Sequence, residues 1–426
     1  MPSYLALKTL DDSSTTAIGN GGPVLLIWGQ IGIALTALCM AVCLGELASA
    51  MPNAAGQLYW VSVLAPKRAR RVLAYFTGML AWASSLCIVT SGTPDFVYKP
   101  WMGFVGFQAT NLFVFFFNTV GRFLPRLGQA SLGMSVSSAR HVFTDFTNTS
   151  GWGSGIAALT GLLGINWGYS CLDVCTHLAE EVPRPERNVP KALIATIVVG
   201  FSTAFPMVIA LLFSATDFTA IITTRTLVPS LEAFRQACGT AGAIGLQSLV
   251  VVVFLGSIFG AHTWQSRLCW SFARQNGLPF SGHLSRIAPR PFSVPFYAHI
   301  TSCVVASLLG FLYLGSTVAF NAFVGCGLYF QYTTYSICVI CLFIRGRSTL
   351  RHGPFWLPRL GPFCGIVTVL WTVFSLIMYS FPPSATITPT KVTYAPVVYV
   401  GVLVITAACW LLHGQRHFVT LDLDAE

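Results

Sequence analysis

The sequence predicts an all-α polytopic membrane protein, and three observations carry this prediction. Only 9% of the 426 residues are charged, against about 25% in a typical soluble domain. Hydrophobic residues make up 54% of the chain, and its mean hydropathy is +0.69. Apolar runs of membrane-spanning length recur from residue 21 onward, and the lysines and arginines gather in the loops on one side of them.

Ten apolar runs approach or exceed the roughly 20 residues that a helix needs to cross a bilayer. They lie between a polar N-terminal leader, residues 1–20, and a cytoplasmic tail, residues 414–426. The leader lacks the apolar core of a cleavable signal peptide. Residues 21–413 are therefore expected to form one transmembrane domain. Its predicted spans are residues 21–50, 72–91, 101–120, 155–177, 192–215, 241–269, 295–314, 319–344, 361–381 and 397–413.

The cations support this map, because most of the 24 lysines and arginines fall on one side, which the positive-inside rule makes cytoplasmic. The number of crossings nevertheless fails in two places. The cations before the span 155–177 and those after it are both predicted to be cytoplasmic, although only this one span separates them. A second crossing must therefore lie between them, and it is missing within residues 127–153. The first span must run inward, which leaves the leader outside unless another helix precedes it.

The most informative stretch is residues 161–181, which reads GLLGINWGYSCLDVCTHLAEE. It begins as an apolar helix, but glycines weaken the helix interior and polar and ionisable residues follow. A helix interrupted in mid-membrane leaves backbone N–H and C=O groups that can bind a small charged solute, as in secondary transporters. The alternative is that the small residues let two helices pack closely.

The residues expected to bind the solute at this interruption are Gly164, Asn166, Trp167, Gly168, Tyr169, Ser170 and Asp173. The two aromatic residues would hold an ammonium group by cation–π attraction, worth about 0.5–2 kcal/mol each, with ordinary packing as the alternative. Asp173 would pair with the amine or take part in proton coupling. Its structural alternative is capping or pairing at the helix end.

Several motifs together resemble the fungal amino-acid/choline transporter family, which includes the GABA and choline permeases and belongs to the amino acid–polyamine–organocation superfamily. The resemblance covers nearly the whole chain from Gly21 to about Val419. The motifs are GGPVLLIWG at 21–29, ELASAMPNAAGQLYW at 46–60, YFTGMLAW at 75–82, DVCTHLAEE at 173–181, VPKAL at 189–193, WSFARQNGLPFS at 270–281 and GSTVAFNAF at 315–323.

The resemblance implies twelve helices, two inverted five-helix repeats plus two more, with the solute between the broken first and sixth helices. The span 155–177 looks like the sixth. The expected fold is thus an inverted-repeat permease with about ten of the usual twelve helices, because the family's first and fifth helices are absent. These are the two crossings that the cation count also misses. The chain departs from the family at Cys171, where the family has a glycine.

A second group of residues is expected to serve gating or coupling: Glu46, Glu180, Glu181, His262 and Asn321. Glu46 should pair with an arginine of an inner loop, and the two later glutamates with Arg184, Arg187 or Lys191. His262 would relay protons or be a hydrogen-bonded core histidine. Asn321, like Gln331, would line the pathway or bridge helices.

Other function classes find no support in the sequence. Cys171 and Cys175 lie beside His177, but no second ligand cluster accompanies them, so no metal or cofactor is expected. No paired catalytic residues or HExxH motif indicate an enzyme, and no basic stripe with aromatics indicates nucleic-acid binding. Asn148 begins a glycosylation sequon in a segment predicted outside, although it lies close to a span.

The functional hypothesis is a secondary permease that moves a small amine-bearing solute across the bilayer by alternating access. The resemblance implies an amino acid, GABA, choline or a polyamine, protons as the coupling ion, and the plasma membrane rather than a vacuolar or other internal membrane. The alternative, motivated by the two absent helices, is a non-transporting membrane sensor or a degenerate permease remnant.

Overall fold

A computed structural model describes residues 14–91, 137–224, 226, 228–290, 293–386, 388 and 392–420. Across these residues the regular structure is entirely helical. The predicted span 101–120 and residues 127–136 lie outside the described part of the chain, as does most of the leader.

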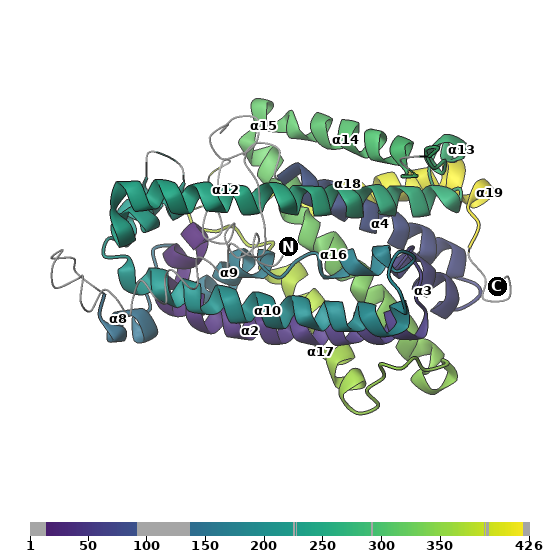
Figure 1. Cartoon of the computed structure of the whole chain (residues 1–426). Coiled ribbons are helices and arrows are strands. Elements are labelled where there is room, and N and C mark those ends of the chain that lie inside the picture. The colour runs from purple at the N-terminus through teal and green to yellow at the C-terminus, as the bar shows by residue number, and fades with distance from the viewer. Residues whose placement is uncertain are drawn as a thin grey trace.

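The long helices form one bundle, in which some run side by side and others cross them obliquely (Figure 1). The elements are α2 (Ser14–Ala50), α3 (Gln57–Leu64), α4 (Arg70–Ser91), α8 (Ala139–Thr144), α9 (Ser154–Trp167), the 3-10 helix η3 (Leu172–Leu178), α10 (Pro185–Ser214), α11 (Phe218–Ile222), α12 (Pro229–Arg274), α13 (Ser281–Leu284), α14 (Phe296–Gly310), α15 (Leu312–Gly315), α16 (Thr317–Arg345), the 3-10 helix η4 (Arg347–Thr349), α17 (Leu360–Met378), α18 (Ala395–Cys409), the π-helical turn η5 (Trp410–Gly414) and α19 (Gln415–His417).

Eight helices of the described residues are long and apolar enough to cross a membrane. Each corresponds to one predicted span, so the all-α polytopic architecture is confirmed. Of the other two predicted spans, 101–120 is not described. The span 155–177 is not a continuous helix, because α9 ends at Trp167.

The N-terminal helix begins earlier than the hydropathy predicts. Helix α2 starts at Ser14, inside the residues assigned to the leader, but the backbone leaves the helical region at Gly22, with φ 70° and ψ −163°. Glycine alone adopts such a conformation readily, and the following Pro23 suits the first turn of a helix. The continuous membrane-spanning part therefore starts at Pro23, two residues from the predicted start.

Helix α2 packs along α9, α10 and α17, whereas α4 packs against α12 and α16. Helix α14 covers α12 and α4 on the outside of the bundle, and α18 lies against α16. Helix α12 spans 46 residues because two helices join at Cys238 and Gly239, where the backbone is non-helical. The predicted span 241–269 is the second of these helices.

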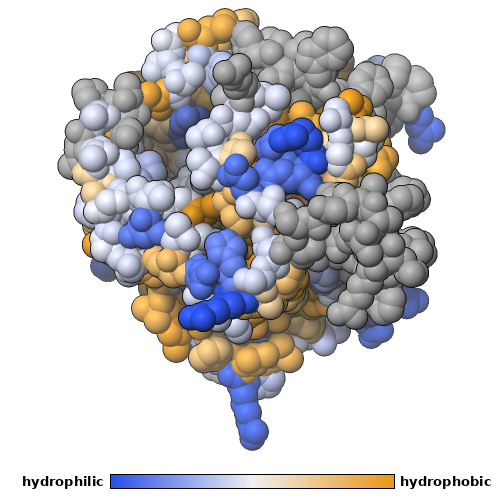
Figure 2. All heavy atoms as spheres, turned by 90° about the vertical axis from the view of Figure 1, so that its left-hand side faces the viewer, coloured by the Kyte–Doolittle hydropathy of each residue, from blue (hydrophilic) through white to orange (hydrophobic). Residues whose placement is uncertain are grey.

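The two ends of the bundle differ in charge. The end with α3, α13 and α19, here called the cation-rich end, carries the loops that contain most arginines (Figure 1). The opposite end, near α8, is here called the far end. Figure 2 looks onto the far end and shows hydrophilic residues across its middle, with hydrophobic residues predominating toward the lower edge. The positive-inside rule makes the cation-rich end cytoplasmic.

Candidate functional site

The predicted interruption is present in the middle of the bundle. Helix α9 ends at Trp167, the chain turns through Gly168, and the helical path resumes only at η3. Between them Cys171 adopts the left-handed conformation, with φ 61° and ψ 34°. A residue other than glycine pays about 1–3 kcal/mol for such a backbone, which explains why glycine suits this position. The amide of Cys171 donates to Oε1 of Gln331, 3.1 Å away.

The carboxylate of Asp173, just after the interruption, is buried and receives four hydrogen bonds. Its Oδ1 accepts from Nε2 of Gln331 (3.0 Å) and the hydroxyl of Tyr335 (2.8 Å). Its Oδ2 accepts from Nε2 of Gln57 (2.8 Å) and lies 3.3 Å from Nε2 of His177. These partners come from α3, α16 and η3, so Asp173 joins three elements. No lysine or arginine of the described residues pairs with it.

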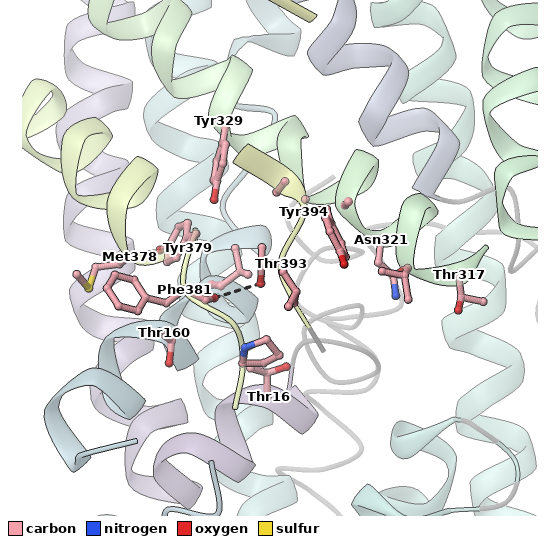
Figure 3. A pocket seen from close by; sticks show the side chains of 17 residues that line it. Thr16, Thr160, Thr317, Asn321, Tyr329, Met378, Tyr379, Phe381, Thr393 and Tyr394 are labelled. Carbon is pink, nitrogen blue, oxygen red and sulfur yellow. Dashed lines mark hydrogen bonds between the residues drawn. The ribbon is translucent and has the colours of Figure 1, made fainter. Parts of the chain in front are cut away.

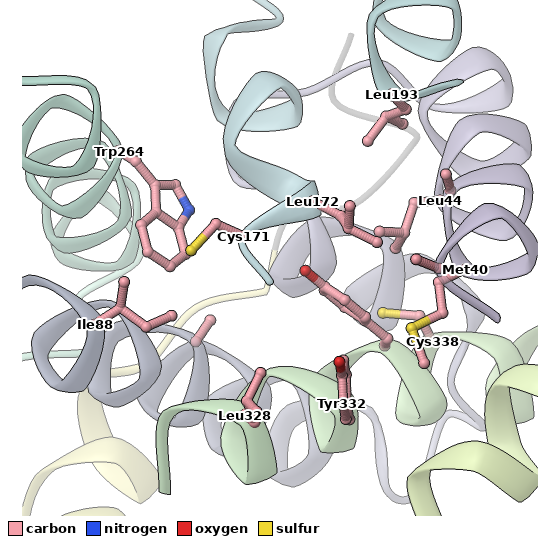
Figure 4. Packing of buried hydrophobic residues seen from close by; sticks show 14 of the residues in the cluster. Met40, Leu44, Ile88, Cys171, Leu172, Leu193, Trp264, Leu328, Tyr332 and Cys338 are labelled. Carbon is pink, nitrogen blue, oxygen red and sulfur yellow. The ribbon is translucent and has the colours of Figure 1, made fainter. Parts of the chain in front are cut away.

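In this arrangement Asp173 is bonded to protein donors, and its predicted roles in amine pairing and proton coupling stay predictions. A carboxylate has about four acceptor sites, and protein donors occupy them all. Gln331, for which lining and bridging were both predicted, bridges α16 to the interruption. The surroundings are tightly packed: Cys171 and Leu172 lie among side chains from α2, α4, α12 and α16 (Figure 4). A solute amine would therefore have to displace one of these donors to reach Asp173.

Asn166 also serves as a cross-link. Its Nδ2 donates to the hydroxyl of Tyr379 (2.9 Å), and its Oδ1 accepts from the hydroxyl of Tyr332 (2.7 Å). The asparagine thus ties α9 to α16 and to the end of α17. The sequence analysis missed these tyrosines and Tyr335. The signal that was available is the run FQYTTY in α16, where two tyrosine hydroxyls recur at three-residue spacing beside a glutamine in an apolar helix.

The remaining predicted binding residues are buried around the interruption. The Trp167 ring packs close to Gly327 of α16, and the Tyr169 hydroxyl accepts from Nε2 of Gln30, 3.4 Å away. The Ser170 hydroxyl donates to the carbonyl of Trp167 (2.9 Å). Gly164 is buried in α9, and Gly168 caps that helix. The proposed roles of these residues in solute binding stay predictions.

The small residues of α9 also provide close packing, the alternative that the sequence left open. A Cβ atom added at Gly161 would lie 2.5 Å from Cδ2 of Leu25 in α2. A larger residue would force the Leu25 side chain to move, so Gly161 helps α2 and α9 to pack closely. Helix α9 therefore shows both features: close packing at Gly161 and, further along, the interruption after Trp167.

A cavity of about 450 Å³ opens near the far end, within the roughly 300–1,000 Å³ of typical ligand pockets. Asn321 of α16, for which lining the pathway or bridging helices was predicted, lies in the wall of this cavity. The described lining carries no formal charge and combines aromatic rings with neutral polar groups (Figure 3). Its side chains with rings or polar groups are Thr16, Thr160, Thr317, Asn321, Tyr329, Tyr379, Phe381, Pro383, Thr393 and Tyr394.

The cavity adjoins the interruption through one tyrosine. Tyr379 lines the cavity and its hydroxyl accepts from Asn166 of α9. Tyr329, one turn before Tyr332 in α16, also lines the cavity and contacts the hydroxyl of Ser380 at 3.2 Å. A hydrogen-bonded chain therefore connects the cavity wall to the interrupted helix.

Glu46 lies at the cation-rich end and is completely buried. Its two oxygens accept from both terminal nitrogens of Arg347 at 2.9 Å, and Oε1 also accepts from the amide of Leu357 at 2.8 Å. A Cβ atom at Gly361 would lie 2.3 Å from Glu46 Oε1, so glycine is needed beside the pair. The bidentate pair ties α2 to the loop between α16 and α17, and a gating role for it stays a prediction.

The partners predicted for Glu180 and Glu181 are wrong. Glu181 pairs with Arg267, and Glu180 lies 3.7 Å from Arg274. Both arginines belong to α12 rather than to the adjacent loop, because the chain after η3 runs toward the end of α12. The loop cations are near the two glutamates in sequence, but the fold places α12 closer to them in space.

The sequon residue Asn148 uses its amide within the loop before α9. Its Nδ2 donates to the carbonyl of Trp152 (2.7 Å), and its Oδ1 accepts from the amide and hydroxyl of Ser150. Glycosylation would leave this nitrogen one N–H, which the bond to Trp152 already requires. His262 of α12 lies beside His299 and Cys303 of α14.

Comparison with known proteins identifies the family. The amino acid permease family model matches residues 10–97 and 99–403. The chain belongs to the amino acid permease family. A choline transporter of Saccharomyces cerevisiae is 39% identical, with 99% of this chain and 80% of that protein aligned. A swainsonine transporter, swnT, of Arthroderma benhamiae is 37% identical, over 96% of this chain and 87% of that protein.

The fold of the permease is that of solved transporters. A manganese transporter of Eremococcus coleocola superimposes with a TM-score of 0.51 at 12% identity, covering 96% of this chain and 92% of that one. The expected inverted-repeat permease fold is therefore confirmed. The family and the relatives named above are transporters, so the chain is a multi-pass membrane protein of a transporter family and not an enzyme.

The alignment with the yeast choline transporter contains 455 positions, whereas the chain has 426 residues. At least 29 aligned positions therefore have no residue in this permease.

The Glu46–Arg347 pair yields a stability prediction. Replacing Arg347 by alanine leaves a buried carboxylate without its partner, which typically costs about 3–5 kcal/mol. We expect Arg347→Ala to lower the apparent Tm of the detergent-purified permease clearly, as measured by thermal denaturation. Arg351→Ala is the matched control, because Arg351 is exposed in the same loop and has no ion pair among the described residues. Equal Tm values for both variants would contradict the importance of the pair.

Proposed function

We propose that the permease is a secondary transporter for a small cationic amine that carries hydroxyl groups and no carboxylate. Choline and swainsonine, named for two relatives, are both hydroxylated nitrogen compounds of this kind. Amino acids, GABA and polyamines, which the sequence also suggested, are less well matched to the cavity. The plasma membrane is the proposed location, with solute entering from the far end.

The chemistry of the cavity is the observation that carries this proposal. Its described lining offers the rings of Tyr329, Tyr379, Phe381 and Tyr394 but no carboxylate or cation. Aromatic rings attract a quaternary or protonated amine by about 0.5–2 kcal/mol each without requiring a counter-ion. The hydroxyls of the threonines and the amide of Asn321 suit a hydroxyl group of the solute. A zwitterion would in addition need donors for its carboxylate.

The position of the cavity supports alternating access. It opens at the far end and closes against Tyr379, which is bonded to the interrupted helix. At the cation-rich end the bundle is closed by the Glu46–Arg347 pair and by the contacts of Glu180 and Glu181 with α12. Opening toward the other side requires these ionic contacts to separate while the cavity closes.

The pair Asp173–His177 supports proton coupling. His177 is fully buried, with Nδ1 2.8 Å from the carbonyl of Ala54 and Nε2 3.3 Å from Asp173. Both neighbours are acceptors, but a neutral imidazole carries only one N–H. The two contacts are satisfied together when the pair holds one proton beyond neutral histidine and carboxylate. We infer that this shared proton is the one exchanged during transport.

The competing hypothesis is a non-transporting sensor or a permease remnant. The residues of the choline transporter that lack a counterpart here favour it, because a missing helix would remove part of the moving bundle. Hydrogen bonds that already satisfy Asn166 and Asp173 fit it as well. Uptake measurements separate the two hypotheses directly.

The first test of transport uses radiolabelled choline in yeast cells that lack their own choline uptake. We expect uptake that unlabelled hydroxylated amines inhibit and amino acids do not. Tyr329→Leu should raise KM by about 2- to 30-fold, because it removes one cation–π contact of about 0.5–2 kcal/mol. Tyr329→Phe should preserve KM, since it keeps the ring.

The control for this test is Phe311→Leu, which changes an exposed aromatic residue that does not line the cavity. A Tyr329→Leu permease with unchanged KM would exclude the cavity as the binding site. Absence of uptake for every amine, with normal amounts of folded protein at the membrane, would favour the sensor or remnant hypothesis.

The test of coupling uses proteoliposomes with and without an inward proton gradient. We expect Asp173→Asn and His177→Gln each to abolish the stimulation by the gradient, because neither variant retains the shared proton. Solute exchange without a gradient should persist if each variant still folds, which a Tm measurement checks. Asp145→Asn is the matched control: Asp145 also contacts a histidine four residues away, His141 at 3.1 Å, but both are exposed. Gradient stimulation that survives in both Asp173→Asn and His177→Gln would refute the coupling role.

A further inference from the structure

Two histidines and a cysteine meet between α12 and α14, away from the cavity and from Asp173. His262 projects from α12, whereas His299 and Cys303 lie one turn apart at the start of α14. One ligand atom from each, two imidazole nitrogens and the thiol sulfur, lie within 4.8 Å of one another. All three side chains are half-buried, so the cluster is neither sealed in the core nor fully open.

The distances in this cluster match those of a zinc site. Cys303 Sγ lies 3.6 Å from Nδ1 of His262 and 3.6 Å from Nε2 of His299. A tetrahedral zinc ion with bonds of about 2.0–2.1 Å to nitrogen and 2.3 Å to sulfur separates these ligands by roughly 3.6 Å. Both pairs that involve the sulfur therefore already have the spacing of a common central ion.

Hydrogen bonding is the alternative account of the cluster. Cys303 can donate its one proton to one imidazole and accept from the N–H of the other. The two imidazole rings also meet edge to face, with centroids 5.7 Å apart, rather than stacking. The three potential ligand atoms nevertheless lie within 4.8 Å of one another, close enough for small side-chain movements to bring them around one ion.

A neighbouring glutamine gives a second observation. Gln265 lies one turn beyond His262 in α12 and is completely buried. Neither its Oε1 nor its Nε2 makes a hydrogen bond in the described structure. A buried carboxamide without a partner costs about 1–3 kcal/mol. Metal-bound histidines usually donate their second N–H to such a group, so a bound ion would give Gln265 a partner.

We propose that His262, His299 and Cys303 bind a zinc ion that joins α12 to α14. Neutral imidazoles with one thiolate form a donor set typical of zinc, which takes nitrogen and sulfur ligands in tetrahedral sites. Three protein ligands leave the fourth position to water or to a small exogenous ligand. The ion crosslinks α14, on the outside of the bundle, to the end of α12 whose arginines pair with Glu180 and Glu181.

The experiment uses the full-length permease, purified in detergent without a histidine tag and stripped of metal with a chelator. Titration with Co²⁺ reports the ligands, because cobalt replaces zinc in such sites and absorbs strongly when tetrahedral and thiolate-bound. We expect one Co²⁺ per chain, a thiolate-to-cobalt charge-transfer band, and displacement of the spectrum by Zn²⁺. Zn²⁺ should also raise the Tm of the permease.

Variants decide whether these three residues are the ligands. Cys303→Ser should remove the charge-transfer band, and His262→Ala and His299→Ala should each weaken Co²⁺ binding at least tenfold. Cys409→Ser is the matched control, because Cys409 is another half-buried thiol of a membrane helix. Failure of the wild-type permease to bind Co²⁺ or Zn²⁺ would overturn the proposal. So would a charge-transfer band that persists in a correctly folded Cys303→Ser variant. Transport activity plays no part in either outcome.

Discussion

The buried carboxylate of Asp173 is the constraint on which the centre of this permease depends. A charge away from water must be balanced by protein donors, and four donors from α3, α16 and η3 surround it. Because Gln331 also accepts from the amide of Cys171, the same network holds the strained turn of the interrupted helix. The break in the helix and the assembly of the bundle are therefore stabilised together.

The same requirement explains the two ends of the bundle. At the cation-rich end, Glu46 is buried and receives a bidentate arginine and a backbone amide, which fastens α2 to the loop before α17. At the far end the cavity contains no charge among its described lining residues, so it can stay open to water without an unpaired ion. The ionic contacts and the neutral cavity therefore lie in different parts of the bundle.

The hydrogen-bonded chain from the cavity to the interruption suggests how the two could communicate. Tyr379 belongs to the cavity wall and to the Asn166 cross-link, and Asn166 lies one helical turn and a short loop before Asp173. A solute that moves the Tyr379 ring would therefore disturb α9 next to the Asp173–His177 pair. A hydrogen bond joins Tyr379 to Asn166, and the chain itself continues from Asn166 to Asp173.

The sequence by itself determined the all-helical membrane architecture and the end of the bundle where the cations lie. It indicated an interruption within residues 161–181, with close helix packing as the alternative, and the structure placed the helix end at Trp167, so that Gly164 and Asn166 are still helical. The sequence predictions follow from local properties: apolar run length, glycine placement and loop charge. The sequence also indicated that Glu46 has an arginine partner. Only the tertiary structure decided that this partner is Arg347. It also decided that Glu181 pairs with Arg267 and that Glu180 lies near Arg274. The hydrogen bonds of Asp173 to protein donors likewise appear only in the fold. It alone brought His262 to His299 and Cys303. Such contacts join residues from distant helices, and the packing of the bundle, which no local pattern encodes, selects among chemically equivalent partners.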